Sequence, residues 1–317
     1  MHPKTLEQVG PLITQLMCTL ALGMALVLPC RGSDHHRDTV DAFPAGVDVA
    51  PSQGYFAAEG VGVRVTDCSS GPRCMRQRCD GSAQLVTVSE LPVVSSSFER
   101  ADYAPVATIV TSIGNIQLIG RNSAGVTTSK QLAGKRIGVV VGSSSHFYVD
   151  AYVHFHAIDL RQVEASGGYS RHTGPALKSL GVEAVVLDDS RTYTESHYLV
   201  VNQRTLAERE GDRVKVLRAP QRAERLIAEY PLQANAKAKA KAIMQARANL
   251  DRAFVDSIFP SFNYRLSLEQ SLVNSMQGVA RWSLREGHVA PGRRIPNFRD
   301  FVEPGPLRTA VPMAFPT

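Results

Sequence analysis

The sequence predicts an α/β fold. Three observations support this: a globular composition, an alternation of short apolar strands with helical segments between residues 61 and 190, and a mainly helical region after residue 200. The chain has 317 residues, 44% hydrophobic and 20% charged, which is enough for two domains of ordinary size. Because alternating strands and helices are typical of parallel sheets covered on both faces, we expect such sheets here.

The first half of the chain contains four expected strands. The stretch "GYFAAEG" ends a helix and turns at Gly60 before a strand at 61–66 with alternating valines. "SSGP" then opens a helix, and "AQLVTVSELPVV" indicates a strand that ends at 89–92. The segments 106–112 and 116–122 are expected to form a strand pair around "IGN".

From residue 128 to residue 190 the chain repeats the order helix then strand, and after residue 200 it becomes mainly helical. A helix capped by Thr128 or Ser129 ends at Gly134, and a strand begins at Ile137. "GPALKSLGVEAVVLDDS" again reads as helix then strand. Three helices follow residue 200, and their last has a set of apolar residues expected on its inner face: Leu268, Leu272, Met276 and Trp282.

The N-terminus contains an apolar run at 12–28, after Lys4. The run has the length of an export signal and is short for a membrane span. We therefore predict that residues 1–33 are a signal peptide or an N-terminal anchor. If the signal is cleaved, the mature chain begins near Cys30–Asp34.

Charge and cysteine spacing argue against several classes of function. The net charge of +6 is spread thinly and does not alternate with aromatic residues, which argues against nucleic-acid binding. Cys68, Cys74 and Cys79 form no C-x-x-C motif, and no His pair has ligand spacing, so no metal is expected. No Ser-His-Asp arrangement is evident, so no catalytic residue and no cofactor are assigned.

The stretch "IGVVVGSSSHFYV" resembles a ligand-binding loop more than a nucleotide loop. It lacks the Lys of a Walker motif and the glycines of a dinucleotide fingerprint. Gly142 permits a tight turn, and Ser143, Ser144 and Ser145 open a helix whose first N–H groups have no internal partner. These groups suit an anion, although serine is also an ordinary helix cap. Both readings remain open from the residues alone.

Six segments in order resemble one family. They are "GYFAAEG", "SSGP", "SELPVV", "GNIQLIGRNSAGVTTSKQLAGKRIGVVVGSSSHFYV", "ALKSLGVEAVVL" and "ARWSLREG…IPNFRDFVEPGPLRTAVP". Together they resemble the nitrate/sulfonate/taurine group of ABC-transporter periplasmic substrate-binding proteins over residues 43–312. The first strand of that family is not evident in the polar segment 34–53, and Gln84 stands where the family often has an acid.

The resemblance implies a two-lobed periplasmic-binding-protein fold of type 2, with a ligand cleft at the hinge. Each lobe would be a mixed sheet flanked by helices, and the chain would cross between lobes near 120–122 and 197–202. The chain would then divide into a signal peptide or anchor at 1–33, the first part of lobe 1 at 34–121, lobe 2 at 122–197, and a return to lobe 1 with the C-terminal helices at 198–317.

The same resemblance implies a binding protein rather than an enzyme. The expected role is the extracytoplasmic, periplasmic component of an ABC importer for a small anion such as nitrate, taurine or another sulfonate. Its partners would be the permease and ATPase subunits, with the protein itself a monomer. Alternatives are an enzyme resembling the thiamin pyrimidine synthase, and a sensor domain outside transport. The candidate ligand-binding residues are Ser70, Ser89, Glu90, Leu91, Asn115, Ser143, Ser144, Ser145, His146 and Asp188.

Overall fold

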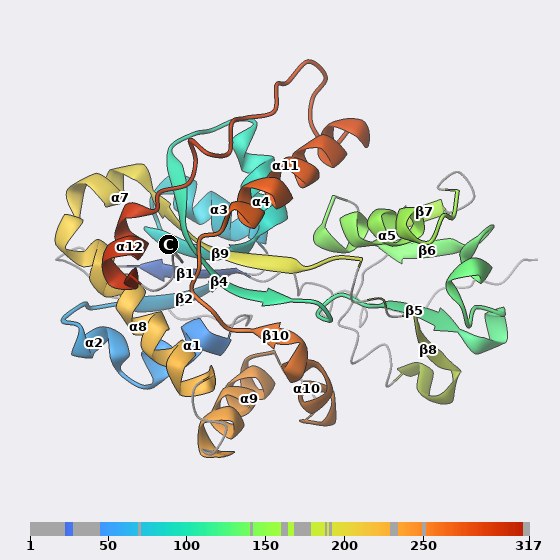
Figure 1. Ribbon diagram of the computed structural model, residues 1–317, viewed down its shortest axis with the longest axis horizontal. Helices are drawn as coiled ribbons and strands as arrows, with labels where there is room; N and C mark the ends of the chain where they lie inside the picture. Colours follow the sequence, from blue (N-terminus) through green and yellow to red (C-terminus); the bar gives the residue numbers. More distant parts are fainter. Residues whose placement is uncertain are drawn as a thin grey trace, which may run out of the picture.

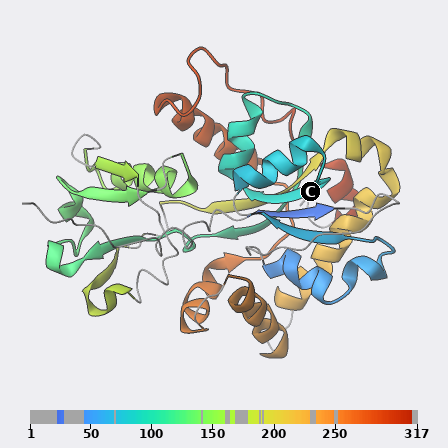
Figure 2. The same ribbon diagram turned by 180° about the vertical axis from the view of Figure 1, so that it is seen from behind.

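The computed structural model has a larger part built on one six-stranded sheet and a smaller part built on two short sheets (Figures 1 and 2). It describes residues 23–27, 45–68, 71–139, 142–159, 164–167, 179–187, 189, 192–228, 234–248 and 252–312.

The large sheet has the strand order β10-β4-β9-β3-β1-β2. Its strands are β1 (Gly23–Val27), β2 (Arg64–Cys68), β3 (Leu85–Ser89), β4 (Tyr103–Ser112), β9 (Glu195–Asn202) and β10 (Phe262–Asn263). All five pairings are antiparallel, so the expectation of parallel sheets is wrong here. The reason is the position of β9 and β1. The strands β2, β3 and β4 run in the same direction, as the alternation predicted, but β9 lies between β3 and β4 and β1 lies between β2 and β3.

Helices cover both faces of this sheet and enclose two apolar cores. One core lies under α3 (Gly71–Asp80), α4 (Glu90–Ser97) and α11 (Gln270–Arg285). The other lies under α1 (Ala45–Ser52), α8 (Glu210–Ala228), α9 (Ala234–Ala248), α10 (Arg252–Ile258) and α12 (Gly305–Ala310). Shorter elements at its edges are α2 (Tyr55–Ala58), α7 (Gln203–Glu208) and the 3-10 helix Phe259–Ser261. The expected helices after residue 200 are confirmed, and Leu272, Met276 and Trp282 of α11 are buried.

The smaller part contains two short sheets and one long helix. β5 (Leu118–Arg121) pairs with β8 (Ala184–Leu187), and β6 (Arg136–Val139) pairs in parallel with β7 (Glu164–Gly167). The helix α5 (Ser144–Phe155) packs against them around a third apolar core. The described residues of this part also form the 3-10 helices Asn122–Ala124, Ser129–Leu132 and Gly181–Glu183.

The chain passes between the two parts twice. It leaves the large sheet after β4 and enters β5 at Leu118, and it returns from β8 into β9 at Glu195. The segments 106–112 and 116–122 therefore form no strand pair with each other, because they belong to different sheets. The sheets change a few residues before each expected crossing, and the lobe boundaries at 122 and 197 stay a prediction.

β1 comes from the segment predicted as an export signal or anchor. Gly23–Val27 lies between β2 and β3 and pairs with both. The first strand of the sheet therefore precedes the segment 34–53, in which the family resemblance led us to look for one. A mature chain that began near Cys30 would lack it and would leave facing edges of β2 and β3 unpaired. Export processing stays a prediction that competes with this use of the segment.

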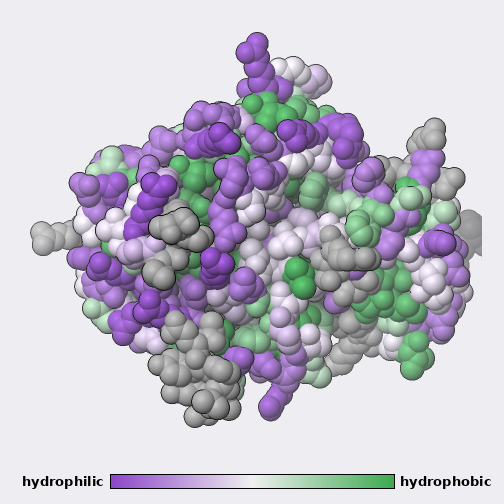
Figure 3. Space-filling model, in the orientation of Figure 1, coloured by the Kyte–Doolittle hydropathy of each residue, from purple (hydrophilic) through white to green (hydrophobic). Residues whose placement is uncertain are grey.

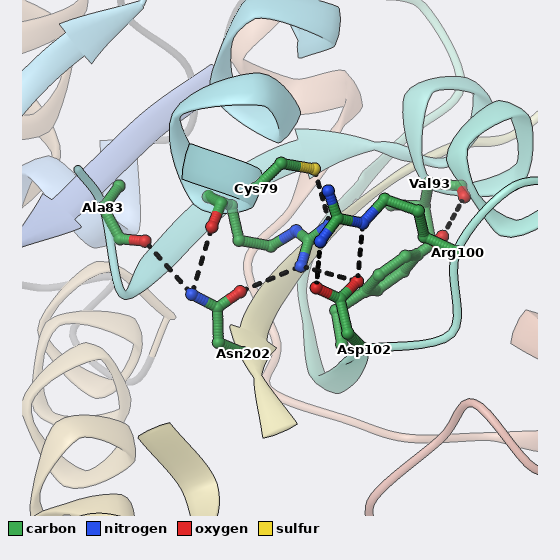
Figure 4. Close-up of polar contacts among 8 residues, drawn as sticks. Cys79, Ala83, Val93, Arg100, Asp102 and Asn202 are labelled. Atoms are coloured by element: carbon green, nitrogen blue, oxygen red, sulfur yellow. Dashed lines mark hydrogen bonds and ion pairs between the residues drawn. The ribbon is translucent and has the colours of Figure 1, made fainter. Parts of the chain in front are cut away.

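A buried arginine ties together the end of the large sheet that lies away from the smaller part. Arg78 of α3 is 1% exposed and donates to Asn202 at 2.8 Å and to Asp102 at 3.5 Å (Figure 4). Its guanidinium lies 4.3 Å from the centre of the Tyr103 ring, and Arg100 also donates to Asp102. This positive charge therefore has a carboxylate partner inside the fold, which it shares with Arg100.

The surface carries its apolar residues in small groups. Figure 3 shows hydrophilic residues over most of this face, with separate hydrophobic patches. Among the described residues, the exposed large hydrophobic side chains are Ile113, Phe155, Val182 and Val186. Scattered residues of this kind are ordinary on protein surfaces. No helix in the described ranges has both the length and the apolar character needed to cross a membrane.

Candidate functional site

The serine loop forms the start of α5 as expected. Gly142 adopts φ +73°, the left-handed region that glycine enters without a Cβ clash. Ser143 occupies the N-cap position, but its side chain makes no capping hydrogen bond. Instead its hydroxyl lies 2.8 Å from the hydroxyl of Ser145. The first turn of a helix leaves N–H groups without intrahelical acceptors and carries partial positive charge, so helix starts of this kind favour anions.

The start of α5 meets the end of β3. The hydroxyls of Ser89 and Ser144 are 3.5 Å apart, although the two residues are far apart in sequence. Ser89 is the last residue of β3, and the strand ends there because Glu90 begins α4. Ser89 therefore lies at the C-terminal end of a strand, as expected. Two predicted ligand residues from different parts of the molecule are brought together.

Glu90, the residue after Ser89, is fully buried. It accepts hydrogen bonds from the hydroxyls of Tyr193 at 2.7 Å and Tyr198 at 3.4 Å. Burial raises the pKa of Glu90 to about 7, and the nearby charge of Glu195 adds to the rise. The hydrogen bonds from Tyr193, Ser275 and Tyr198 oppose it. Glu90 therefore titrates near neutral pH.

Asn115, another predicted residue, contacts a second buried acid. Its amide donates to the carboxylate of Glu195, and its backbone N–H donates to the hydroxyl of Ser112 at 3.1 Å. Glu195 and His197 are 6% and 4% exposed. Burial lowers the pKa of His197, while the charge of Glu195 opposes that shift. The histidine is therefore neutral at pH 7.

His146 lies in an aromatic cluster that joins α5 to α11. Its ring contacts Trp282 and His288 edge-on, each with centroids 5.2 Å apart. The Trp282 indole donates to Asp150 of α5 at 2.6 Å. His146 also accepts a hydrogen bond from the N–H of Gly142 at 3.2 Å, which fixes the turn before the serines. This cluster holds the start of α5 against the larger part.

Of the other predicted residues, the structure describes Leu91 but not Ser70 or Asp188. Leu91 is buried in the core beneath α4. Ser70 and Asp188 lie outside the described residues. Within the described part, no group of three or more His, Cys, Asp or Glu side chains could hold a metal ion. Sequence reasoning missed Tyr193, Glu195, His197 and Trp282. The alternation of Glu195 and His197 in "ESHYLVV" was a usable signal, because alternate residues of a strand share a face.

A family model matches the central part of the chain. Residues 44–187 match the model described as "NMT1/THI5 like", and this segment includes β3, α4 and the serine loop. No curated protein matches the chain.

Several solved structures share the fold at low identity. The alkanesulfonate-binding protein SsuA from Xanthomonas axonopodis pv. citri bound to MOPS has a TM-score of 0.58 and 14% identity, covering 82% of this chain and 95% of its own. A Candida albicans protein described as having the generic periplasmic binding protein fold has a TM-score of 0.56 and 14% identity, with coverages of 82% and 92%. The desulfurization enzyme DSZB has a TM-score of 0.60 and 13% identity, with coverages of 87% and 99%.

These likenesses establish the fold, and they include both binding proteins and an enzyme. They agree with the resemblance to the nitrate/sulfonate/taurine group that the sequence motifs indicated. The chain carries an NMT1/THI5-like segment at residues 44–187 and has the α/β fold of periplasmic binding proteins.

Proposed function

We propose that this chain is the substrate-binding component of an ABC importer for a small anionic ligand of the nitrate, taurine or sulfonate class. The observation that carries the proposal is the contact of Ser144 with Ser89, which sets the donor-rich start of α5 against the end of β3. Ligands in α/β proteins bind beyond the carboxyl ends of strands, and helix starts favour anions. The proposed setting is the periplasm, with a permease and an ATPase as partners and the binding protein as a monomer.

Two substitutions of one residue test the anion site. Ser144→Asp places a carboxylate among the donors, yet keeps a side chain that suits a helix start. It should fold normally and lose anion binding. Ser144→Ala removes one hydroxyl and should weaken binding by about 1–3 kcal/mol if that hydroxyl donates to a charged group.

The measurement is calorimetric titration after a thermal-shift screen over nitrate, taurine and alkanesulfonates. A ligand present at about a hundred times its dissociation constant should raise the free energy of unfolding by roughly 2.7 kcal/mol. Undiminished affinity in Ser144→Asp would remove the proposed anion site. Ser271→Asp is a matched control, because Ser271 is exposed in the first turn of α11, at the opposite end of that helix from Trp282.

A second candidate is catalysis on the same fold. It is favoured by the buried Glu90, whose pKa near 7 suits a general acid or base. The two functions differ in the fate of the ligand. A binding protein returns its ligand chemically unchanged after denaturation, whereas an enzyme returns product. Mass spectrometry of the released molecule after prolonged incubation separates them.

A further inference from the structure

Two helices from different parts of the molecule meet at an aromatic cluster. α11 of the larger part ends beside α5 of the smaller part (Figure 1). The Trp282 indole of α11 donates to the carboxylate of Asp150 on α5 at 2.6 Å, and both side chains are buried. The ring of His146 on α5 packs edge-on against the ring of Trp282. The cluster therefore crosses from one part of the molecule to the other.

His288 joins this cluster from the end of α11. Gly287 adopts φ +72°, and the backbone N–H of His288 donates to the carbonyl of Ser283 at 2.8 Å, which closes the helix with a Schellman turn. The ring of His288 lies against Trp282 with centroids 4.7 Å apart, and against His146 with centroids 5.2 Å apart. Two histidines, one from each part, thus contact the same indole.

The hydrogen bond of His146 requires an unprotonated Nδ1 atom. This atom accepts the backbone N–H of Gly142 at 3.2 Å, so the ring is neutral in this arrangement and carries its proton on Nε2. Protonation of Nδ1 places two N–H groups against each other and breaks the bond. It also places a positive charge beside the ring of His288, where a second protonated imidazole is repelled. The contacts of His146 therefore depend on its being neutral.

Packing alone does not explain the histidine at position 288. Its Nε2 atom is buried and has no hydrogen-bond partner, which destabilises the fold. A phenyl ring at this position could contact Trp282 in the same way and would bury no polar atom. The imidazole therefore adds a group that can take up a proton, at a structural cost that an apolar ring would avoid.

The charged groups around His288 determine the sign of its response to pH. Burial lowers the pKa of His288, and the charge of His146 lowers it further, while Glu286 and Asp150 oppose the shift. Glu286 is itself paired with Arg285 at 2.7 Å. Because the pKa of the packed ring is below the ordinary value of 6.5, the packed state binds fewer protons than the open state. The contact is therefore full above pH 6.5 and weakens as the pH falls below that value.

We propose that His146, Trp282 and His288 form a pH-sensitive latch that holds the two parts together when both imidazoles are neutral and opens when they are protonated. The start of α5 carries both His146 and Ser144, so opening moves Ser144 away from Ser89 of β3. The proposed anion site is then assembled above about pH 6.5 and taken apart in acid. The latch goes beyond the proposed function and operates without a ligand.

Trp282 is the single tryptophan of the chain, so its fluorescence reports the latch directly. The side chain is 3% exposed, and opening should move its emission to longer wavelength as water reaches the indole. For the ligand-free protein taken from about pH 8 to about pH 5, the range in which histidine titrates, we expect a reversible shift with a midpoint below pH 6.5. The radius of gyration from small-angle scattering should rise over the same range. Emission and radius that stay constant overturn the latch.

Glutamine variants separate the two imidazoles from other acid-sensitive groups. His146→Gln keeps an acceptor for the N–H of Gly142, His288→Gln keeps a neutral polar side chain, and neither amide takes up a proton. The emission shift should be reduced in each single variant and absent in the double variant. His154→Gln is the matched control, because His154 lies on the same helix as His146 but is exposed, and it should keep the full shift.

A further variant excludes the other group that titrates in this range. The pKa of Glu90 is about 7, so a shift that survives in the double histidine variant and disappears in Glu90→Gln assigns the transition to Glu90 and overturns the latch. Thermal unfolding at each pH separates opening from loss of fold.

Proton NMR of the wild-type protein covers the case in which a histidine variant does not fold. His146 and His288 are identified by their contacts with the Trp282 ring, and both should gain protons over the pH range of the emission shift. A complete shift while both rings stay neutral contradicts the latch. Because none of these measurements uses a ligand, a failed latch leaves the anion site standing, and a failed anion site leaves the latch standing.

Discussion

The two ends of the large sheet differ in whether their buried charged side chains have a partner of opposite charge. At one end Arg78 contacts Asp102, Asn202 and the ring of Tyr103, so its positive charge has a carboxylate partner within the fold. At the other end, among the described residues, Glu90 and Glu195 are buried together with no positive partner. The same strands, β4 and β9, contribute to both ends.

The difference separates a structural network from the end of the sheet where we propose the binding site. A balanced network stabilises the folded chain alone, and its loss should appear in unfolding. An unbalanced group destabilises the free protein. Changes at the Arg78 end should therefore lower stability, while removal of charge at the Glu90 end should raise it.

The largest expected effect is at Arg78. Arg78→Met removes the donor to Asn202 and the cation over Tyr103 while keeping much of the side-chain volume. We expect a loss of about 3 kcal/mol in the free energy of unfolding, from the partly buried amide of Asn202 left without its donor and from lost packing. Chemical denaturation measures it. Arg76→Met is the control, because Arg76 lies on the same helix but is exposed, and it should change stability by less than about 0.5 kcal/mol.

Neutralising Glu90 should have the opposite sign. The pKa of this acid is raised from 4.5 to about 7 in the folded chain, so its contribution to stability is full below pH 4.5 and is lost as pH rises through 7. Glu90→Gln has no carboxylate to ionise, so this variant does not lose stability as the pH rises through 7. At pH 8 the variant should be more stable than the wild-type protein by on the order of 2 kcal/mol, after allowance for one weakened hydrogen bond. A variant less stable than wild type at pH 8 would show that the Glu90 end is also a balanced network.

Local signals in the sequence predicted the elements but not their partners. Gly142 and the three serines marked the turn and the start of α5, and the apolar run that ends at Ser89 marked β3. These features depend on neighbouring residues, so a single sequence carries them. The candidate site residues Ser89, Ser144 and Asn115 followed from the same signals.

The pairing of distant segments could not be predicted in this way. The insertion of β9 between β3 and β4 depends on contacts across about a hundred residues, which no local pattern encodes. The use of Gly23–Val27 as β1 was hidden because a short apolar run suits an export signal equally well. Glu195 and His197 became visible as a site only when the fold placed them beside Glu90 and Ser89.

The smallest expected effect comes from removing one hydrogen-bond donor to Glu90 while its carboxylate is kept. Tyr193→Phe removes the hydroxyl that donates to Glu90 at 2.7 Å and leaves the ring and its packing on Phe147 in place. Because that hydrogen bond lowers the pKa of Glu90, its loss should raise the pKa further. At pH 8 the variant should lose about 1 kcal/mol of stability, and the loss should shrink at pH 5, where Glu90 is protonated. Unfolding free energies measured at both pH values test this. An equal loss at both would mean that the hydroxyl supports packing and not the charge of Glu90, and the Tyr193 contact would then belong with the balanced end of the sheet.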